Sequence, residues 1–492
     1  MFFLTTFLES VSLVSVPWYR RLNQALRALF GQPALPAAKV FCREADSKAF
    51  STFIMDPRWS LRVITDGLKR CAEAALAAIS TSHALFPVFH DTTELNWGGK
   101  RLGLFPLHGS TNAAKSGMLL HASLLTVPQS GSAWMPVTLS HVETLVRSPK
   151  ATAKASKAKA KHEVVVKSAS EALRWTRGVE ATNELLEGYR QRALHIADCE
   201  ADNFAVFAAA SEKGHHFIIR AKHSRKLLDA AGATSKLEET IDLEAGVDMA
   251  ELHLPQRKPS DKPAKNKAHP PRQARRAKIK IGWHEVTLAR PAKASRNLPT
   301  TMTLRLVWVR EDPQTIPAGE KGIDWHLLTS LDVPDEAAAR EVVANYRKRW
   351  MIEDYFKVFK VGTAVEARQH ETRETLERMI GLLLVVAMAM FRSLKAWRES
   401  PEAAAETVFD EETIEVLKLI DVSSKPKQLR NFAQLTVEQV LIAIARLGGY
   451  KSSSKPPGML VIWRGFWELD RAKHAIRAAS KQPTNGRNPP NH

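Results

Sequence analysis

The sequence is poor in cysteine and has no long apolar run free of charge. Its 492 residues include three cysteines, Cys42, Cys71 and Cys199, and no CxxC pair. These features exclude a disulfide-stapled fold and a cysteine-ligated zinc site, and they are typical of a reducing compartment. The longest apolar run, Met379–Phe391, is shorter than the roughly 20 residues of a membrane-spanning helix, so it predicts one buried helix.

The chain also has far fewer acidic than basic residues. The chain has 52 Asp and Glu against 71 Lys and Arg, which leaves a net charge of +19 and a pI near 9.8. Such a surplus attracts polyanions over a long range, so nucleic acid is the first expected partner and an anionic membrane surface the second. The apolar N-terminal stretch carries Glu9 and has no basic region before it, which makes it a poor signal peptide. We expect a soluble, cytoplasmic protein.

The length favours about three domains, and the pattern of the sequence divides the chain in this way. Residues 1–82 are predicted to be helical. Residues 83–395 alternate short apolar strands with helices, and the part at about 221–335 is rich in strands. The predicted strands are 86–91, 117–126, 193–198, 216–220, 279–288, 301–309 and 325–331. Residues 396–492 are predicted to be mostly helical and to end in a Pro/Asn-rich tail. The sequence therefore indicates an α/β centre between two helical regions.

Two basic stretches interrupt this pattern. Lys150–Lys161 contains five lysines and no acid, and Pro255–Lys280 contains ten Lys and Arg, one Asp and five prolines. Neither composition can bury a core, so both are predicted to be exposed, with the second a basic loop.

Two of the predicted strands, Phe86–Asp91 and Ala193–Asp198, end in aspartate, and a later predicted helix carries Glu353. Mg²⁺ is held by a few carboxylates, and ligands gather at the carboxyl ends of strands in open α/β sheets. Three carboxylates could hold two Mg²⁺ or Mn²⁺ ions about 4 Å apart, an arrangement that serves phosphoryl transfer. A strand-terminal aspartate is more often a turn or helix cap, so the pattern alone leaves both interpretations open.

The helix that carries Glu353 has an unusual row of polar side chains. Tyr346, Arg349, Glu353 and Lys360 follow one another at gaps of three, four and seven residues, which predicts one helical face, and Lys357 lies near the same stripe. A solvated, salt-bridged helix surface is the alternative interpretation.

The row Tyr346-x2-Arg349-x3-Glu353-x6-Lys360 resembles the YREK signature of bacterial DDE transposases of the insertion-sequence-four family. Further blocks resemble this family in the same order, and the likeness runs from about Ser47 to Leu469; the first fifteen residues have no counterpart. These blocks are His90–Leu95, Ala197–Asp202, Arg220–Lys226, Trp325–Ser330, Ala445–Tyr450, Pro457–Gly458 and Trp463–Gly465.

The resemblance implies an α/β (α+β) fold with a ribonuclease-H-like, mixed-sheet catalytic core over residues 83–395. It implies a β-rich insertion at about 221–335, with a basic loop at 255–280. A helical DNA-binding domain at 1–82 and a helical dimerisation region at 396–492 would flank the core.

The same resemblance implies cut-and-paste transposition of an insertion sequence. Asp91, Asp198 and Glu353 would be catalytic and would hold two Mg²⁺ or Mn²⁺ ions. The reaction would run through strand cleavage, a hairpin, its opening and strand transfer. The partners would be double-stranded DNA, both the terminal inverted repeats and the target, and a second copy of the chain in a synaptic complex. The protein would act in the bacterial cytoplasm, at the nucleoid.

Trp325 would be the residue that stacks on the base extruded during hairpin formation. An aromatic face can receive such a base, since unstacking alone costs a few kcal/mol. Without the resemblance, a buried strand tryptophan is the favoured interpretation. Tyr346, Arg349 and Lys360, together with Lys357, would grip phosphates beside the bond that is cut.

Arg220 and Lys222 are two residues apart on a predicted strand, which points them to one face, where they could also contact phosphates; an exposed pair on an edge strand is the alternative. His90 and His195 lie beside the proposed ligands but are not included, because Mg²⁺ prefers oxygen. Cys199 has no recognisable base to activate it. The sequence has no GxxxxGK[ST], HExxH or GxSxG motif.

Two alternatives to a transposase remain. One is a catalytically inactive, sequence-specific DNA-binding protein derived from a transposase, and the other is a stand-alone nuclease with the same core. The presence of Asp91, Asp198 and Glu353 favours an enzyme, and the YREK row argues against simple hydrolysis.

Overall fold

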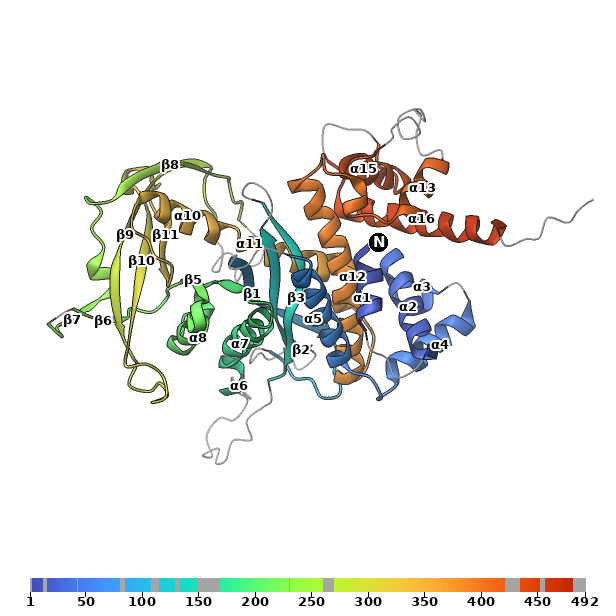
Figure 1. Ribbon diagram of the computed structural model, residues 1–492, viewed down its shortest axis with the longest axis horizontal. Coiled ribbons are helices and arrows are strands. Elements are labelled where there is room, and N and C mark those ends of the chain that lie inside the picture. Colours follow the sequence, from blue (N-terminus) through green and yellow to red (C-terminus); the bar gives the residue numbers. More distant parts are fainter. Residues whose placement is uncertain are drawn as a thin grey trace, which may run out of the picture. The chain divides into compact units, whose positions relative to one another are not determined.

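The computed structural model divides into two compact units, which share strand β1 (Figure 1). The helical unit comprises Met1–Ile79, Thr92–Glu171 and Glu353–His492, and the sheet unit comprises Ser80–Asp91 and Ala172–Ile352. The structure describes residues 2–11, 16–41, 43–79, 85–107, 115–128, 133–147, 169–229, 231–259, 270–420, 434–451 and 456–480. The stretch at 150–161, predicted to be an exposed loop or a frayed helix, and the tail at 481–492 lie outside these residues. The division into domains at 82 and 395 stays a prediction.

The N-terminal segment is helical, as predicted. Its helices are α1 (Phe2–Ser10), α2 (Val16–Gly31), α3 (Ala37–Val40), α4 (Glu44–Met55) and α5 (Leu61–Ala77). The apolar face of α5 buries Ile64, Leu68 and Leu76. Gly67 lets α1 approach α5 closely, because a Cβ atom there would lie 2.9 Å from Phe7 Cε2. The first residues of the chain, which resemble nothing in the family, therefore form a packed helix.

Two further strands in the helical unit are antiparallel neighbours. β2 (Lys115–Pro128) pairs with β3 (Trp134–Leu145), and the end of β1 (Leu85–Gly98) lies next to β2. The sequence predicted a strand at Gly117–Thr126 but missed β3. Its burial pattern does not alternate, because the first half is almost entirely buried and the second half is half-buried.

Helix α12 (Arg373–Glu399) contains the long apolar run and is buried over most of its length, as predicted. Within the described part of the chain it is the one helix long and apolar enough to cross a membrane, and 89% of its most apolar window is buried inside the protein. A core helix of a folded domain has the same composition.

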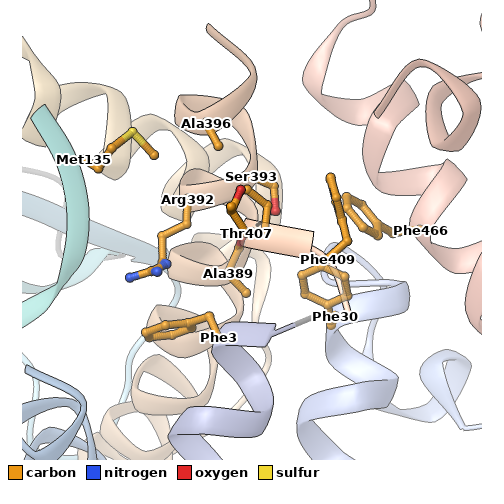
Figure 2. Close-up of a pocket in the computed structure, with 11 residues that line it drawn as sticks. Phe3, Phe30, Met135, Ala389, Arg392, Ser393, Ala396, Thr407, Phe409 and Phe466 are labelled. Carbon is orange, nitrogen blue, oxygen red and sulfur yellow. Dashed lines mark hydrogen bonds between the residues drawn. The ribbon is translucent and has the colours of Figure 1, made fainter. Parts of the chain in front are cut away.

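A small cavity of about 60 Å³ lies beside α12. Figure 2 shows Arg392 of α12 reaching toward Phe3, with Phe30, Phe409 and Phe466 along the rest of the wall. The guanidinium donates a hydrogen bond to Val137 O at 2.6 Å and lies over the Phe3 ring. Burial lowers the pKa of Arg392 to about 10.

The C-terminal helices of this unit are α13 (Glu411–Leu419), α15 (Val437–Leu447) and α16 (Met459–Ser480). α15 and α16 touch backbone to backbone at two glycines. A Cβ atom at Gly448 would lie 1.9 Å from Val461 O, and one at Gly465 would lie 1.8 Å from Ile444 O. Only glycine permits helices to approach this closely.

The sheet unit is built on a mixed sheet in the order β1-β4-β5-β11-β10-β9-β6-β7, with β8 also paired to β9. β1, β4 and β5 are parallel, whereas the pairs from β5–β11 to β6–β7 are antiparallel. These strands are β4 (Arg192–Ala197), β5 (His216–Arg220), β6 (Lys226–Leu228), β7 (Thr234–Lys236), β8 (Val247–Leu254), β9 (Arg275–Ala289), β10 (Thr301–Glu311) and β11 (Asp324–Thr329). The strands predicted at 193–198, 216–220, 279–288, 301–309 and 325–331 are all present, and 221–335 is rich in strands.

Helices α7 (Arg174–Glu187) and α8 (Phe204–Ala210) pack on this sheet through one apolar cluster. The cluster joins Trp175 and Phe207 to Phe217 of β5 and to residues of β9, β10 and β11. The Phe207 and Phe217 rings are stacked with centroids 5.2 Å apart. Helix α10 (Glu336–Arg347) follows the last strand, and α11 (Trp350–Lys357) begins in this unit.

The predicted basic loop at 255–280 is wrong at its C-terminal end. Arg275 to Lys280 belong to β9, and the main chains of Arg257 and Arg272 pair with each other. Arg275 is buried in an ion pair with Glu311, at 2.7 Å, and a second with Glu320. A strand can therefore include charged residues that are paired, although composition alone assigns them to a loop. Residues 260–269 of the predicted loop lie outside the described residues.

Candidate active site

Asp91 and Asp198 lie side by side in the sheet unit. β1 and β4 are parallel neighbours, and the last pair in register is His90 with Ala197. Asp91 and Asp198 are therefore the next pair, and their side chains leave the sheet on the same face, because side chains alternate along a strand. Neighbouring strands are about 4.8 Å apart, so the two aspartates occupy neighbouring positions, one on β1 and one directly after β4.

The strand that carries Asp91 does not end there, which corrects the prediction. β1 continues to Gly98, since Leu95 and Trp97 are buried and half-buried polar residues alternate with them. Only its pairing with β4 ends beside Asp91. Asp198 does follow the end of its strand. It caps the short helix η1 (Cys199–Ala201), where its Oδ1 accepts a hydrogen bond from Glu200 N at 2.8 Å.

A group of cationic and aromatic side chains lies near these carboxylates. Arg349 Nη1 is 3.6 Å from Asp91 Oδ2, and both side chains are largely buried. Arg220, at the end of β5, donates a hydrogen bond to Cys199 Sγ at 3.4 Å, beside Asp198. The sequence proposed both arginines as phosphate ligands, and the structure places each of them next to one of the carboxylates.

Tyr346 links the two arginines electrostatically. Burial raises the pKa of the Tyr346 phenol, while the charges of Arg220 and Arg349 act in the opposite direction. Burial alone would lower the pKa of Arg220, but Tyr346, Cys199 and Asp198 raise it on balance. Arg220 therefore stays cationic beside the Asp198 carboxylate.

Trp325 stands at the edge of this group on β11. Its ring meets the Tyr346 ring edge to face, with centroids 5.4 Å apart and an angle of 67°. Trp325 is half-buried, which differs from the fully buried strand tryptophan that was the alternative interpretation. Part of its surface remains accessible.

Lys222 is not on a strand, which corrects the prediction for this pair. β5 ends at Arg220, and the chain turns after it. Asp202 holds the turn: its Oδ2 accepts hydrogen bonds from the backbone N of Lys222 and His223, and its Oδ1 pairs with Arg225. Arg220 and Lys222 therefore do not share a strand face. The role of Asp202 was missed, although its place directly before the N-cap of α8 was visible.

The row from Tyr346 to Lys360 does not form one regular helical face. α10 ends at Arg347, Arg349 lies in the turn before α11, and the segment Val358–Gly362 is a π-helix. Each irregularity rotates the residues that follow it. The row is therefore divided between an α-helix, a turn and a π-helical segment.

Glu353, Lys357 and Lys360 belong to the helical unit. Glu353 is half-buried in the first turn of α11, and Lys357 is exposed. Lys360 Nζ donates a hydrogen bond to Glu94 O at 2.7 Å and lies 3.6 Å from the Glu366 carboxylate. Lys360 thus ties the π-helical segment to β1.

The residues present suit a hard divalent cation. Asp91 and Asp198 offer carboxylate oxygens from adjacent positions, and oxygen is the ligand atom that Mg²⁺ and Mn²⁺ prefer. His90 and His195, which were left out as ligands, are hydrogen-bonded to each other at 2.8 Å. Over the described residues, no three His, Cys, Asp or Glu side chains form an assembled metal-binding group. The set Asp91, Asp198 and Glu353 stays a prediction.

Comparison with known families identifies part of the chain. Residues 177–389 match a family model described as a transposase DDE domain. The matched range contains Asp198, Trp325 and the row from Tyr346 to Lys360, whereas Asp91 precedes it. A domain of this type implies a ribonuclease-H-like core and a DNA transposase or nuclease activity on DNA.

Proposed function

We propose that the chain is a DNA transposase that moves an insertion sequence of the insertion-sequence-four family by a cut-and-paste reaction. The observation that carries the proposal is the transposase DDE match over residues 177–389, which begins within α7 and includes β4. The parallel strand β1 supports it, because it presents Asp91 beside Asp198 of the matched range.

Asp91, Asp198 and Glu353 would hold two Mg²⁺ or Mn²⁺ ions. Such ions activate a water molecule and stabilise the leaving oxygen in phosphoryl transfer. Glu353 follows Arg349 by four residues, and Arg349 pairs with Asp91. Arg349 contacts Asp91, and Arg220 lies beside Asp198. These contacts support a role in which the two guanidinium groups would bind a DNA phosphate.

The aromatic pair supports the hairpin step of the proposal. Trp325 is braced by Tyr346 and keeps accessible surface, so it can accept an extruded base on its ring face. Lys222, Lys357 and Lys360 would add contacts to the DNA backbone. Lys222 and Lys357 are exposed, as this role requires.

The remaining parts of the proposal follow the family resemblance. Residues 1–82 bind DNA, residues 396–492 serve dimerisation, and two copies bring the terminal inverted repeats together before attack on target DNA. The protein works in the bacterial cytoplasm at the nucleoid. The net charge of +19 supports a polyanionic partner.

The proposal is tested with the full chain and DNA that carries the inverted repeats flanking its coding region. We expect Mg²⁺-dependent nicks, hairpins and double-strand breaks on a denaturing gel. Glu353→Gln should abolish cleavage and leave end binding nearly intact, because affinity comes mainly from basic side chains. Asp354→Asn is the matched control, since this carboxylate is the exposed neighbour of Glu353 on α11. Specific end binding without cleavage by the wild type would instead identify an inactive DNA-binding descendant.

A further inference from the structure

Three buried polar side chains form a hydrogen-bonded row behind the candidate active site. Asn183 of α7 contacts His195 of β4, with Oδ1 2.7 Å from Nε2. His195 Nδ1 in turn lies 2.8 Å from Nε2 of His90 on β1. The exposed fractions are 6% for Asn183 and 1% for each histidine. The row therefore crosses from a helix to two neighbouring strands without access to water.

The direction of these hydrogen bonds follows from the amide of Asn183. Its Nδ2 donates to Ala209 O at 2.9 Å, so Oδ1 is the atom that faces His195 and accepts from Nε2–H. His195 Nδ1 then carries a lone pair and accepts from His90 Nε2–H. Each link determines the tautomer of the next imidazole. Burial and the adjacent His90 lower the pKa of His195 well below its usual value, which agrees with a neutral ring.

The row lies on the face of the sheet opposite the carboxylates. In the register of β1 and β4, His90 is opposite Ala197 and His195 is opposite Val88, so both histidines point to one face. Asp91 follows His90 and Asp198 follows Ala197, so both carboxylates point to the other face. The hydrogen bond between the histidines thus ties the two strands together immediately behind the two aspartates.

We propose that Asn183, His195 and His90 are positioning residues, which hold β1 against β4 so that the Asp91 and Asp198 carboxylates keep a fixed separation. Apolar side chains could fill the same space, but their contacts would not fix the direction or the length of the link between β1 and β4. A fully satisfied polar network in a low-dielectric interior does both, because each partner has a defined position. The inference rests on the proposed function for its catalytic consequence, but not for its structural part.

The structural part has a test that needs no activity. In wild-type protein, ¹⁵N NMR of the imidazoles should show both His195 and His90 protonated on Nε2 and not on Nδ1. A crystal structure of Asn183→Leu should show the Asp91 and Asp198 carboxyl groups at an altered separation. A different tautomer pattern, or an unchanged separation, would overturn the inference even if the wild type cleaves no DNA.

The catalytic part is measured as cleavage rate against Mg²⁺ concentration. Asn183→Leu and His90→Leu should each lower the rate about ten- to hundredfold, or raise the Mg²⁺ requirement as much, as is usual for groups that orient metal ligands. DNA-end affinity should stay within about twofold. His90→Gln should restore most of the rate, because its amide can donate from a similar position.

His215→Leu is the matched control. His215 is also buried, accepts a hydrogen bond from Ala193 N of β4 at 2.9 Å and lies 3.3 Å from Glu187 of α7. It therefore braces the same strand to the same helix, but at the end far from Asp198. The His215→Leu substitution should lower the melting temperature without changing how the cleavage rate depends on Mg²⁺ concentration. If Asn183→Leu also lowers only the melting temperature, the three residues contribute packing alone and the inference is wrong. If the wild type cleaves no DNA, the proposed function fails, and the NMR and crystallographic test alone decides whether the row positions the two aspartates.

Discussion

The Arg349 guanidinium lies against the Asp91 carboxylate, with Nη1 3.6 Å from Oδ2 and side-chain exposures of 11% and 17%. Opposite charges in this setting are screened less than on an open surface. A double-mutant cycle of Arg349→Met and Asp91→Asn should give a coupling free energy of about 1–2 kcal/mol in urea unfolding.

The control for this cycle is the ion pair of Arg43 and Asp46 at the start of α4, where the arginine is 79% exposed. A pair this exposed should give a clearly weaker coupling, because solvent screens the two charges. Equal couplings for the two pairs would mean that Arg349 does not interact with Asp91 more strongly than surface residues do.

If the proposed reaction is correct, Trp325 should affect the hairpin step and not the first nick. Trp325→Ala removes the ring that rests on Tyr346 and is expected to leave nicking intact while hairpin products decrease. Trp325→Phe keeps an aromatic face and should retain more hairpin than the alanine variant. Nicked, hairpin and double-strand-break products are resolved on a denaturing gel. Loss of nicking and hairpin in equal proportion would assign the tryptophan to folding or to general DNA binding.

The contact of α15 with α16 should not tolerate a methyl group. Gly465→Ala places a Cβ atom 1.8 Å from Ile444 O, so the helices must separate, at a cost of about 1–3 kcal/mol or more. Gly98→Ala is the control, because a Cβ atom there meets nothing within 4 Å. Urea unfolding compares the two variants. Similar stabilities would show that the helices do not cross at Gly465.

Stability should fall as the solution becomes acidic, in part through His370. Burial lowers the pKa of His370 from 6.5 to about 4, and the charges of Arg368 and Arg101 add to this effect. Between these values the unfolded chain binds a proton that the folded chain does not, so stability is full above pH 6.5 and declines toward pH 4. Between the two pKa values, the free energy of unfolding should change by about 1.4 kcal/mol per pH unit through this group.

His370→Gln should make this part of the profile shallower by about that amount. The free energy of unfolding in urea at about pH 7, 6 and 5 provides the measurement, because this range covers most of the interval between the two pKa values. A variant with the wild-type slope would show that His370 takes up a proton in the folded protein as readily as in the unfolded one.

The lysine-rich stretch should contribute to DNA affinity through charge alone. Replacing the five lysines of Lys150–Lys161 by glutamine removes five cations from a stretch whose sequence contains no acid. For each phosphate that the variant no longer neutralises, the slope of log affinity against log salt should become shallower by about 0.9 on duplex DNA. Binding to specific and random sequences should weaken alike. An unchanged salt slope would show that the stretch does not touch DNA.

The sequence predicted the local elements of this protein better than their long-range relations. The strands at 193–198 and 216–220 were found because short apolar runs end there in turn residues. The continuation of β1 past Asp91 depends on the burial of Leu95 and Trp97 against distant segments, which local periodicity does not contain. The turn at Arg349 and the π-helical segment were missed for the same reason.

For the candidate site, residue identities were easier to predict than partners. The pairing of Arg349 with Asp91 joins positions far apart in the sequence, and spacing along one helix could not indicate it. The His90–His195 hydrogen bond was also out of reach, because it requires the register of β1 on β4. A parallel register is set by connections of many residues and not by adjacent ones.

The register of β1 also limits how the chain can change in length. A single-residue insertion between Leu85 and Asp91 would turn Asp91 to the histidine face and His90 to the carboxylate face. A single-residue deletion there would have the same effect, so this segment cannot change in length by one residue without reversing the two faces. The connection between β9 and β10, from Arg290 to Thr300, has no such restriction, because its residues are mostly exposed and loop length costs little. Among related sequences, gaps should therefore collect in that connection and be absent from the stretch of β1 that precedes Thr92.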